Sequence, residues 1–387
     1  MLRRRSVRFG LALLVAVSAS LTLSAQKMRV LEYGPASSVG MDQAALDKGI
    51  DLFRQAVERD ELRGTVLMVV RHGTIVLHEA IGWRHAAYQL PMEKDTLFRM
   101  ASNTKPVVAT AVLLLEQDGR LSVDDRAATH LPSFDTYRSR DITIAHLLSH
   151  SSGLRIGPIF FPFDEAKEKG EAPTLQGAVA KFGAEGPEFA PGTTYSYNNA
   201  GYNTLGAIIE RASGLPLEKF LRTRIYKPLG MTDTLNHEDP AKLARMGTVY
   251  RGEKAENGAV AWTQRFTPGD PPDFPMVRAS GGMISTAMDY AKFLQMYLNG
   301  GEYAGARILT AASIARATTA HVKTGDEGSY GFGWMISPDG VYAHSGSDGT
   351  YAWVDPSRGL FGVVFTQNPG GVNPREAFRE IVAAACR

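Results

Sequence analysis

The stretch FRMASNTKPVVATAVLLLEQDGRL, residues 98–121, sets Ser102 and Lys105 one turn apart at the start of an apolar helix that ends near Gly119. Side chains three residues apart lie on one face of a helix, so the hydroxyl and the amine are neighbours. A serine hydroxyl needs a base within reach to become a nucleophile, and burial among apolar residues helps an amine lose its proton. The stretch therefore predicts a nucleophile beside its base. A capping serine and a solvated lysine are the structural alternative.

A second stretch, TTYSYNNAGYNTLG at 193–206, carries Tyr197 and Asn199 just before an amphipathic helix. A phenol can relay a proton, and an amide can hold a substrate carbonyl or a lysine. Tyr195 offers a competing Y-x-Y reading, but the spacing to Tyr202 favours Tyr197. A tyrosine that only packs in the core is the alternative.

A third stretch, YAHSGSDGTYAWVDP at 342–356, contains His344-Ser345-Gly346 within a predicted strand. Glycine inside a strand marks the close approach of a ligand or another segment of backbone. A literal K-T-G at 323–325 is expected in a loop rather than on a strand, and we interpret it as a decoy. His146 and His150 are four residues apart but lack the glutamate of a zinc helix, so both are interpreted as structural.

Strand patterns occur at both ends of the chain and helix patterns in the middle. Leu46, Ile50, Phe53 and Val57 share one helical face, and the β-rich runs that follow are joined by a turn at His72-Gly73. Helices dominate residues 140–300, one of them with Ser285 as the expected N-cap, and short strands and a final helix follow. The pattern predicts an α/β (α+β) fold: an antiparallel sheet built from both termini, flanked by helices, with an inserted helical subdomain at roughly 101–300.

Taken in order, these stretches resemble the serine β-lactamase and penicillin-binding-protein superfamily. The likeness is greatest to the class C-like branch, which includes β-lactamase-type esterases, D-aminopeptidases and D-alanyl-D-alanine carboxypeptidases. It spans about residues 45–385 and rests on FRMASNTKPV, LLSHSSGL, PGTTYSYNNAGY, ASGGMISTAMDYAKFL and YGFGW. The resemblance implies a β-lactamase-like fold and a hydrolase that needs no cofactor.

The resemblance also implies roles for the motif residues. Ser102 would be the nucleophile, Lys105 and Tyr197 would share the proton transfers, and Asn199 would position the substrate. The oxyanion hole would use the backbone N–H groups of Ser102 and Ser347.

His344 would stand where β-lactamases have a lysine, with Gly346 beside it. A histidine is mostly neutral at neutral pH, so a substrate carboxylate would gain little from it. We therefore expect small esters or D-amino-acid peptides to be better substrates than β-lactams, and we expect the loops 155–190 and 255–282 to shape the pocket. A β-lactamase proper and a catalytically silent penicillin-binding-type recognition module remain the alternatives.

The composition is that of a globular protein, with 44% hydrophobic residues among 387 and a net charge of +2, and gives no indication of nucleic-acid binding. Residues 1–25 combine four arginines with a short apolar run and small residues, which predicts a signal peptide and a secreted or periplasmic protein; a membrane anchor is the alternative. We expect a linker at 26–40 and one hydrolase domain at 41–387. Cys386 is the single cysteine, so no intrachain disulfide can form.

Overall fold

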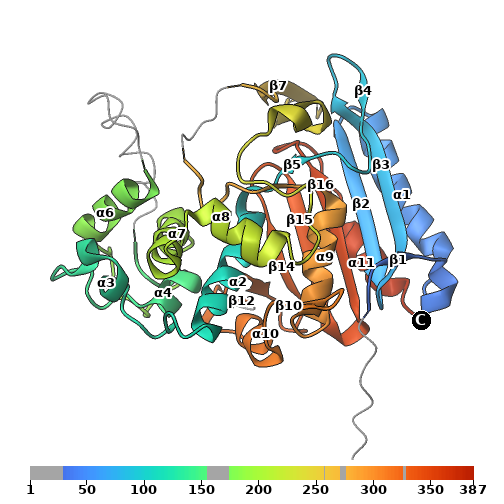
Figure 1. Cartoon of the computed structure of the whole chain (residues 1–387). Helices are drawn as coiled ribbons and strands as arrows, with labels where there is room; N and C mark the ends of the chain where they lie inside the picture. Colours follow the sequence, from blue (N-terminus) through green and yellow to red (C-terminus); the bar gives the residue numbers. More distant parts are fainter. Residues whose placement is uncertain (1–28, 155–173, 257, 271–275, 326–327) are drawn as a thin grey trace, which may run out of the picture.

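The computed structural model describes residues 29–154, 174–256, 258–270, 276–325 and 328–387 (Figure 1). The predicted signal peptide, residues 1–25, lies outside this part of the chain. Within it, no helix is long and apolar enough to cross a membrane.

One large sheet joins the two ends of the chain. Its strand order is β1-β3-β2-β16-β15-β14-β13-β12-β11, with β4 paired to β3. All neighbours are antiparallel except β1 and β3, which run parallel. The strands are β1 Glu32–Tyr33, β2 Gly64–Arg71, β3 Thr74–His85, β4 Leu90–Pro91, β11 Val322–Lys323, β12 Ser329–Tyr330, β13 Met335–Ile336, β14 Tyr342–Ser345, β15 Thr350–Asp355 and β16 Leu360–Thr366. The predicted sheet built from both termini is therefore confirmed.

The N-terminal strands form the predicted hairpin. His72 and Gly73, between β2 and β3, both have positive φ, 54° and 83°. Two such residues in a row match the right-handed twist of the strands that they connect. Next to this hairpin, β16 pairs with β2 along its whole length, with Gly362 opposite Val69.

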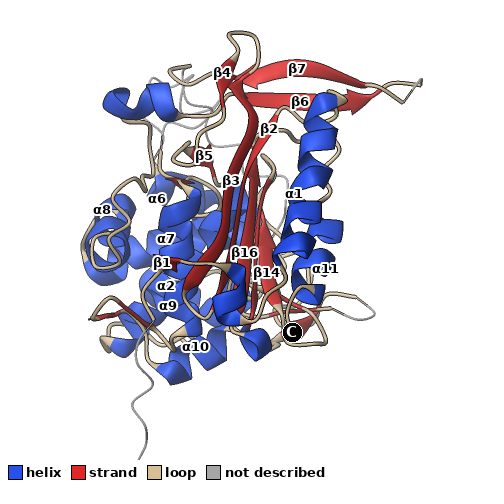
Figure 2. Cartoon of the chain, turned by 90° about the vertical axis from the view of Figure 1, so that its right-hand side faces the viewer, coloured by secondary structure: helices blue, strands red, loops and turns tan. Residues whose placement is uncertain are grey.

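Two helices cover one face of the sheet, and the remaining helices cover the other (Figure 2). α1 (Gln43–Glu58) and α11 (Arg375–Ala384) pack together on the first face. Leu46, Ile50 and Phe53 of α1 are buried as expected, whereas Val57 is only half-buried. The backbone N–H of Asp42 donates to the carbonyl of Ala385, so the start of α1 lies next to the end of α11.

The second face carries α2 (Thr104–Gln117), which is buried from Thr104 to Leu115. A helix that is apolar on every side belongs inside a domain, and α2 is enclosed by its neighbours. The other helices are α3 Ala127–His130, α4 Ile144–Leu148, α6 Leu175–Glu185, α7 Asn199–Ser213, α8 Leu217–Leu221, α9 Ala287–Leu298 and α10 Ala311–Ala317.

Short strand pairs interrupt this helical part. They are β5 (Phe98–Arg99) with β8 (Ile284–Ser285), β6 (Val249–Lys254) with β7 (Val260–Phe266), and β9 (Glu302–Tyr303) with β10 (Ala306–Arg307). The expected N-cap at Ser285 is wrong, because Ser285 belongs to β8. The next residue, Thr286, caps α9 by accepting from the N–H of Asp289.

Candidate active site

Ser102 lies in a 3-10 turn, Ala101–Asn103, that leads directly into α2. Ala101 has a φ of 44°, a left-handed conformation that is uncommon for a residue with a side chain. Such backbone strain costs on the order of 1–3 kcal/mol and persists only where surrounding contacts hold it. Here the Thr104 hydroxyl donates to the Ala101 carbonyl at 2.7 Å and accepts from the N–H of Met283 at 3.0 Å. The turn that presents Ser102 is therefore fixed from both sides.

Lys105 lies one turn further on and is fully buried. Its Nζ lies 2.9 Å from Ser102 Oγ, 2.9 Å from Asn199 Oδ1 and 2.7 Å from the carbonyl oxygen of Ser280. Burial lowers the pKa of Lys105 well below its usual value, and the charge of Arg278 lowers it further. A neutral amine has two N–H donors and one lone pair. Asn199 Oδ1 and the Ser280 carbonyl can only accept, so Lys105 donates to both, and a neutral amine would then have its lone pair left for the Ser102 hydroxyl.

Tyr197 approaches Ser102 from the segment before α7, and its hydroxyl is hydrogen-bonded to the serine side chain. Burial raises the pKa of Tyr197, so the phenol keeps its proton at neutral pH. The amine of Lys105 lies 4.8 Å from the centre of the Tyr197 ring. The structure thus brings together four predicted residues: Ser102, Lys105, Tyr197 and Asn199.

His150 holds the Tyr197 segment in place, a role that the sequence did not reveal. Its carbonyl accepts from the N–H of Ser196 at 2.8 Å, and its Nδ1 accepts from the N–H of Asn198 at 3.3 Å. Tyr197 is fixed between these two bonds, and its ring centre lies 4.2 Å from that of His150. The His150 side chain is buried and the His150 backbone has a φ of 59°. Both observations support the interpretation of this residue as structural.

His146 is also structural. Its side chain accepts from the N–H of Thr143 and completes a capping box at the start of α4. No group of three metal-binding side chains occurs anywhere in the described ranges.

His344, on β14, points into the protein and is only 3% exposed. Its Nδ1 lies 2.8 Å from the carbonyl of Ser345, which can only accept, so Nδ1 carries the proton. Nε2 therefore accepts from the Tyr330 hydroxyl at 3.0 Å. Burial lowers the pKa of His344 to about 3, so the ring is neutral and both nitrogens are occupied.

Gly346 was expected within the strand but directly follows it, since β14 ends at Ser345; the close approach expected of this glycine is present. A Cβ here would lie 2.4 Å from the Met100 carbonyl oxygen and 2.4 Å from Thr350 Oγ1. The contact brings the segment that carries Ser347 against the turn that carries Ser102. Two further bonds tie these segments, because Thr350 donates to the Met100 carbonyl and accepts from the Asn103 side chain.

The K-T-G at 323–325 has a different position from the one expected. Lys323 belongs to strand β11, so the expectation of a loop is wrong for this residue, whereas Thr324 and Gly325 follow outside the strand. That strand lies at the edge of the sheet, with β12 and β13 between it and β14, and the Lys323 side chain is exposed.

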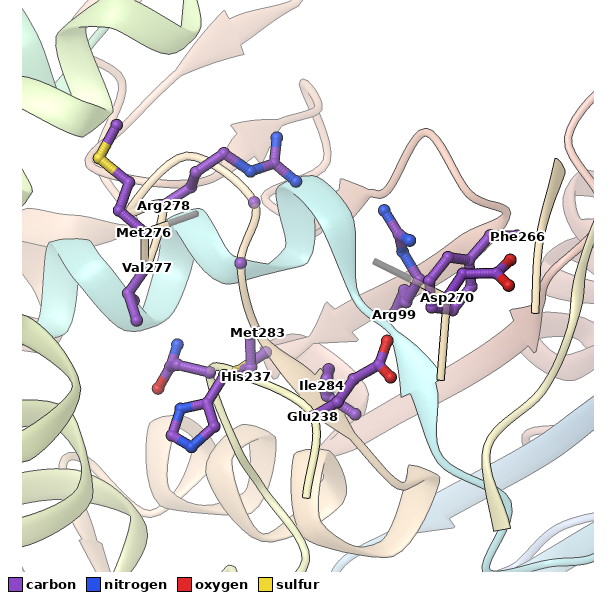
Figure 3. A pocket seen from close by; sticks show the side chains of 13 residues that line it. Arg99, His237, Glu238, Phe266, Asp270, Met276, Val277, Arg278, Met283 and Ile284 are labelled. Atoms are coloured by element: carbon purple, nitrogen blue, oxygen red, sulfur yellow. The ribbon is translucent and has the colours of Figure 1, made fainter. Parts of the chain in front are cut away.

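A cavity of about 430 Å³ (Figure 3) has Gly281 in its lining, and Gly281 packs against the backbone of Ala101; Ser102, Lys105 and Tyr197 do not line it. Residues of the loop 255–282 line this cavity, whereas most of the loop 155–190 lies outside the described residues; that the two loops shape the substrate pocket stays a prediction. The lining side chains are Arg99, Asn236, His237, Glu238, Phe266, Asp270, Met276, Val277, Arg278, Met283 and Ile284, with Gly281 and Gly282 between them.

Comparison with known proteins gives one consistent result. Residues 50–385 match the family model described as Beta-lactamase. The chain is 31% identical over 333 residues to Penicillin-binding protein 4 of Amycolatopsis lactamdurans, covering 79% of this chain and 82% of that protein. It is 35% identical over 222 residues to Esterase EstB of Burkholderia gladioli, covering 51% and 53%.

Among solved structures, EstCE1, titled a hydrolase with promiscuous acyltransferase activity, has a TM-score of 0.75 at 22% identity. The match covers 88% of this chain and 98% of that one, and at this identity it supports the fold alone. The β-lactamase-like fold expected from the sequence is thereby confirmed.

Proposed function

The chain belongs to the beta-lactamase family of serine hydrolases, and from this premise we propose that it cleaves ester or amide bonds through an acyl-enzyme on Ser102. A β-lactamase-type esterase or a D-amino-acid peptidase is the activity that we favour. The observation that carries the proposal is the buried Lys105 amine, whose Nζ lies 2.9 Å from Ser102 Oγ. This is the arrangement of a base and its nucleophile.

The proposed reaction has two steps. Ser102 Oγ attacks the substrate carbonyl carbon while its proton passes to Lys105 Nζ, and the developing oxyanion accepts hydrogen bonds from the N–H groups of Ser102 and Ser347. The C–O or C–N bond then breaks, and the leaving group takes the Tyr197 phenol proton, which Lys105 replaces. Water next attacks the acyl-enzyme, gives a proton to Lys105 through Tyr197, and releases the acid as Ser102 recovers its proton.

A fluorophosphonate probe tests the assignment of the nucleophile, because it forms a stable bond only with an activated serine. We expect the wild-type protein to label and to hydrolyse p-nitrophenyl acetate, and Ser102→Ala to lose both properties with an unchanged circular dichroism spectrum. Ser37→Ala, which alters an exposed serine in the 3-10 helix Ala36–Val39, is the control and should label fully. Normal labelling of Ser102→Ala would contradict the proposal.

The same experiment tests the alternative of a catalytically silent recognition module, because such a module would not react with the fluorophosphonate probe. A chromogenic cephalosporin tests the remaining alternative, a β-lactamase proper. The buried, neutral His344 supports our preference for esters and small peptides, because it offers no cation to a β-lactam carboxylate. Export by residues 1–25 stays a prediction from the sequence.

A further inference from the structure

We propose that a second cavity, at the end of the sheet away from Ser102, binds a small organic anion that also carries a hydrogen-bond donor and an apolar group. The cavity has a volume of about 480 Å³, which is within the size range of small-molecule sites. The end of α9, the helix α10, the turn between β15 and β16 and Arg29 contribute to its walls, and we call it the distal cavity. Such a site does not depend on the proposed hydrolase function.

The length of strand β15 separates the distal cavity from the catalytic turn. Thr350, the first residue of β15, is hydrogen-bonded to Met100 and Asn103, on either side of Ser102. Pro356 and Ser357, which follow the last residue of β15, line the distal cavity. A strand of six residues spans roughly 20 Å, so a ligand in this cavity would not touch the catalytic residues.

A buried amide oxygen in the wall of the distal cavity lacks a partner. Asn299 Nδ2 donates to the Arg29 carbonyl at 2.9 Å, so Asn299 Oδ1 is the acceptor for Gln295 Nε2, also at 2.9 Å. These two bonds fix the orientation of the Gln295 amide and leave its Oε1 over. Gln295 is 1% exposed, and within the described part of the chain nothing donates to Oε1. A buried acceptor without a partner is unfavourable, which points to an N–H or O–H group on a ligand.

The distal cavity also carries positive charge. Arg29 and His72 line it, and the described lining residues include no aspartate or glutamate. Burial lowers the pKa of His72, and the charges of Arg29 and Arg71 lower it further, so both guanidinium groups act at this place. An anionic group on the ligand is therefore favoured. Because Asn299 links Arg29 to Gln295, the anion and the donor should lie only a few bonds apart.

The remaining lining defines the apolar part of the ligand. Tyr297, Leu298, Ile314 and Tyr342 contribute to it, and the centres of the two tyrosine rings are 6.1 Å apart. The Tyr297 hydroxyl is already hydrogen-bonded to Thr110, so this residue offers its ring. An N-acylated amino acid with a hydrophobic side chain combines all three features: a carboxylate, an adjacent amide N–H and an apolar group.

Three matched compounds test the proposal by isothermal titration calorimetry on the whole protein. The probe is N-acetyl-L-phenylalanine. Its amide, N-acetyl-L-phenylalaninamide, lacks the charge, and N-acetyl-N-methyl-L-phenylalanine has a methyl group in place of the N–H. The proteins are wild type, Arg29→Gln, Gln295→Met and Arg251→Gln. The last is the control, because it removes an exposed cation of β6 that does not line the cavity.

We expect wild type to bind the probe with a Kd of about 1 mM or tighter, as is usual for a ligand of this size. The neutral amide and the N-methyl compound should each bind at least about fivefold more weakly, since each loses one polar contact. Arg29→Gln should weaken binding of the probe by about fivefold or more and that of the neutral amide by less than about twofold. Gln295→Met should lose the preference for N–H over N-methyl, and Arg251→Gln should resemble wild type.

Three results would overturn the proposal. Wild type that does not bind the probe at roughly 10 mM would show that the cavity is no site for this class of ligand. Equal binding of the N-methyl compound would mean that water, and not the ligand, serves Gln295. Equal effects of Arg29→Gln and Arg251→Gln would place the binding elsewhere. None of these results alters the proposed acyl-enzyme on Ser102, which the fluorophosphonate probe tests separately.

Discussion

The two walls of the candidate active site are built in opposite ways. The helix wall consists of the turn Ala101–Asn103, the start of α2 and the segment Ser196–Asn199, and it presents side chains to the site. The strand wall consists of β14 and Gly346–Ser347, and its histidine is withdrawn into the core. Lys105 Nζ lies 2.9 Å from Ser102 Oγ, whereas both ring nitrogens of His344 are bonded within the protein.

This difference teaches that similar burial serves two purposes. On the helix wall, burial lowers the pKa of Lys105, which favours the neutral amine that the proposed base requires. On the strand wall, burial removes the charge of His344 so that the imidazole can accept from Tyr330 within the core. We infer that the helix wall performs the chemistry and that the strand wall contributes its backbone.

The largest expected effect comes from removing the base of the helix wall. Lys105→Ala should lower kcat for p-nitrophenyl acetate by about 10²–10⁴-fold, the usual contribution of general acid–base catalysis. Steady-state kinetics with a thermal melt to confirm folding would measure this. Activity within tenfold of wild type in a folded variant would break the distinction between the walls.

The next effect concerns the stability of the strand wall against acid. The pKa of His344 is about 3 in the folded protein and near ~6.5 in an unfolded chain, so between these values the unfolded state binds more protons. Its contribution to stability is therefore complete above pH ~6.5 and decreases as the pH falls, by about 2 kcal/mol at pH 5. Urea unfolding at pH 7.5 and pH 5 should show a smaller loss for His344→Gln than for wild type. Equal losses would show that His344 is not held neutral.

A smaller effect is expected when a charge is placed on the strand wall. His344→Lys should raise the ratio of kcat/KM for a cephalosporin over that for a short-chain ester by roughly five- to tenfold, because a cation binds a carboxylate more strongly than a neutral donor does. The melting temperature should fall, since an amine replaces an imidazole that Tyr330 and Ser345 hold in the core. An unchanged ratio, or a wild type that already prefers the cephalosporin, would contradict the charge argument.

The smallest effect is expected at the K-T-G of β11. Lys323→Ala should alter the free energy of unfolding by less than about 0.5 kcal/mol, as is usual for an exposed position, and leave ester hydrolysis unchanged. Loss of activity in this variant would mean that the edge strand, rather than β14, lines the working cleft.

Local patterns predicted the elements of the site well. The serine and lysine one turn apart can be read from spacing, because helical periodicity fixes which side chains are neighbours. Tyr197 and Asn199 can be found as a motif at the start of α7, but their contact with Lys105 joins segments 94 residues apart. The hairpin at His72-Gly73 can also be read from the sequence, because turn chemistry is local.

What the sequence could not reveal depends on contacts between distant segments. The Ser280 carbonyl meets Lys105 across 175 residues of chain, and Tyr330 meets His344 across a turn and strand β13. LLSHSSGL and YGFGW can be identified as motifs of the family. Neither motif indicates that His150 accepts hydrogen bonds from the backbone N–H groups on both sides of Tyr197. The burial that neutralises His344 is likewise a property of the packed domain and not of its neighbours in sequence.

The pairing of β2 with β16 has a consequence for how the chain reaches this structure. The N–H of Gly64 donates to the side chain of Asn368 across 304 residues, and the two strands lie side by side inside the sheet. Contacts between such distant residues require a large loop to close before they contribute any stability, which slows folding. During synthesis the β2–β3 hairpin must wait, with one strand edge unpaired, until almost the whole chain has been made. Gly346, which belongs to the same C-terminal part of the chain, packs against Met100, so we expect the turn Ala101–Asn103 to be among the last parts of the protein to take its final form.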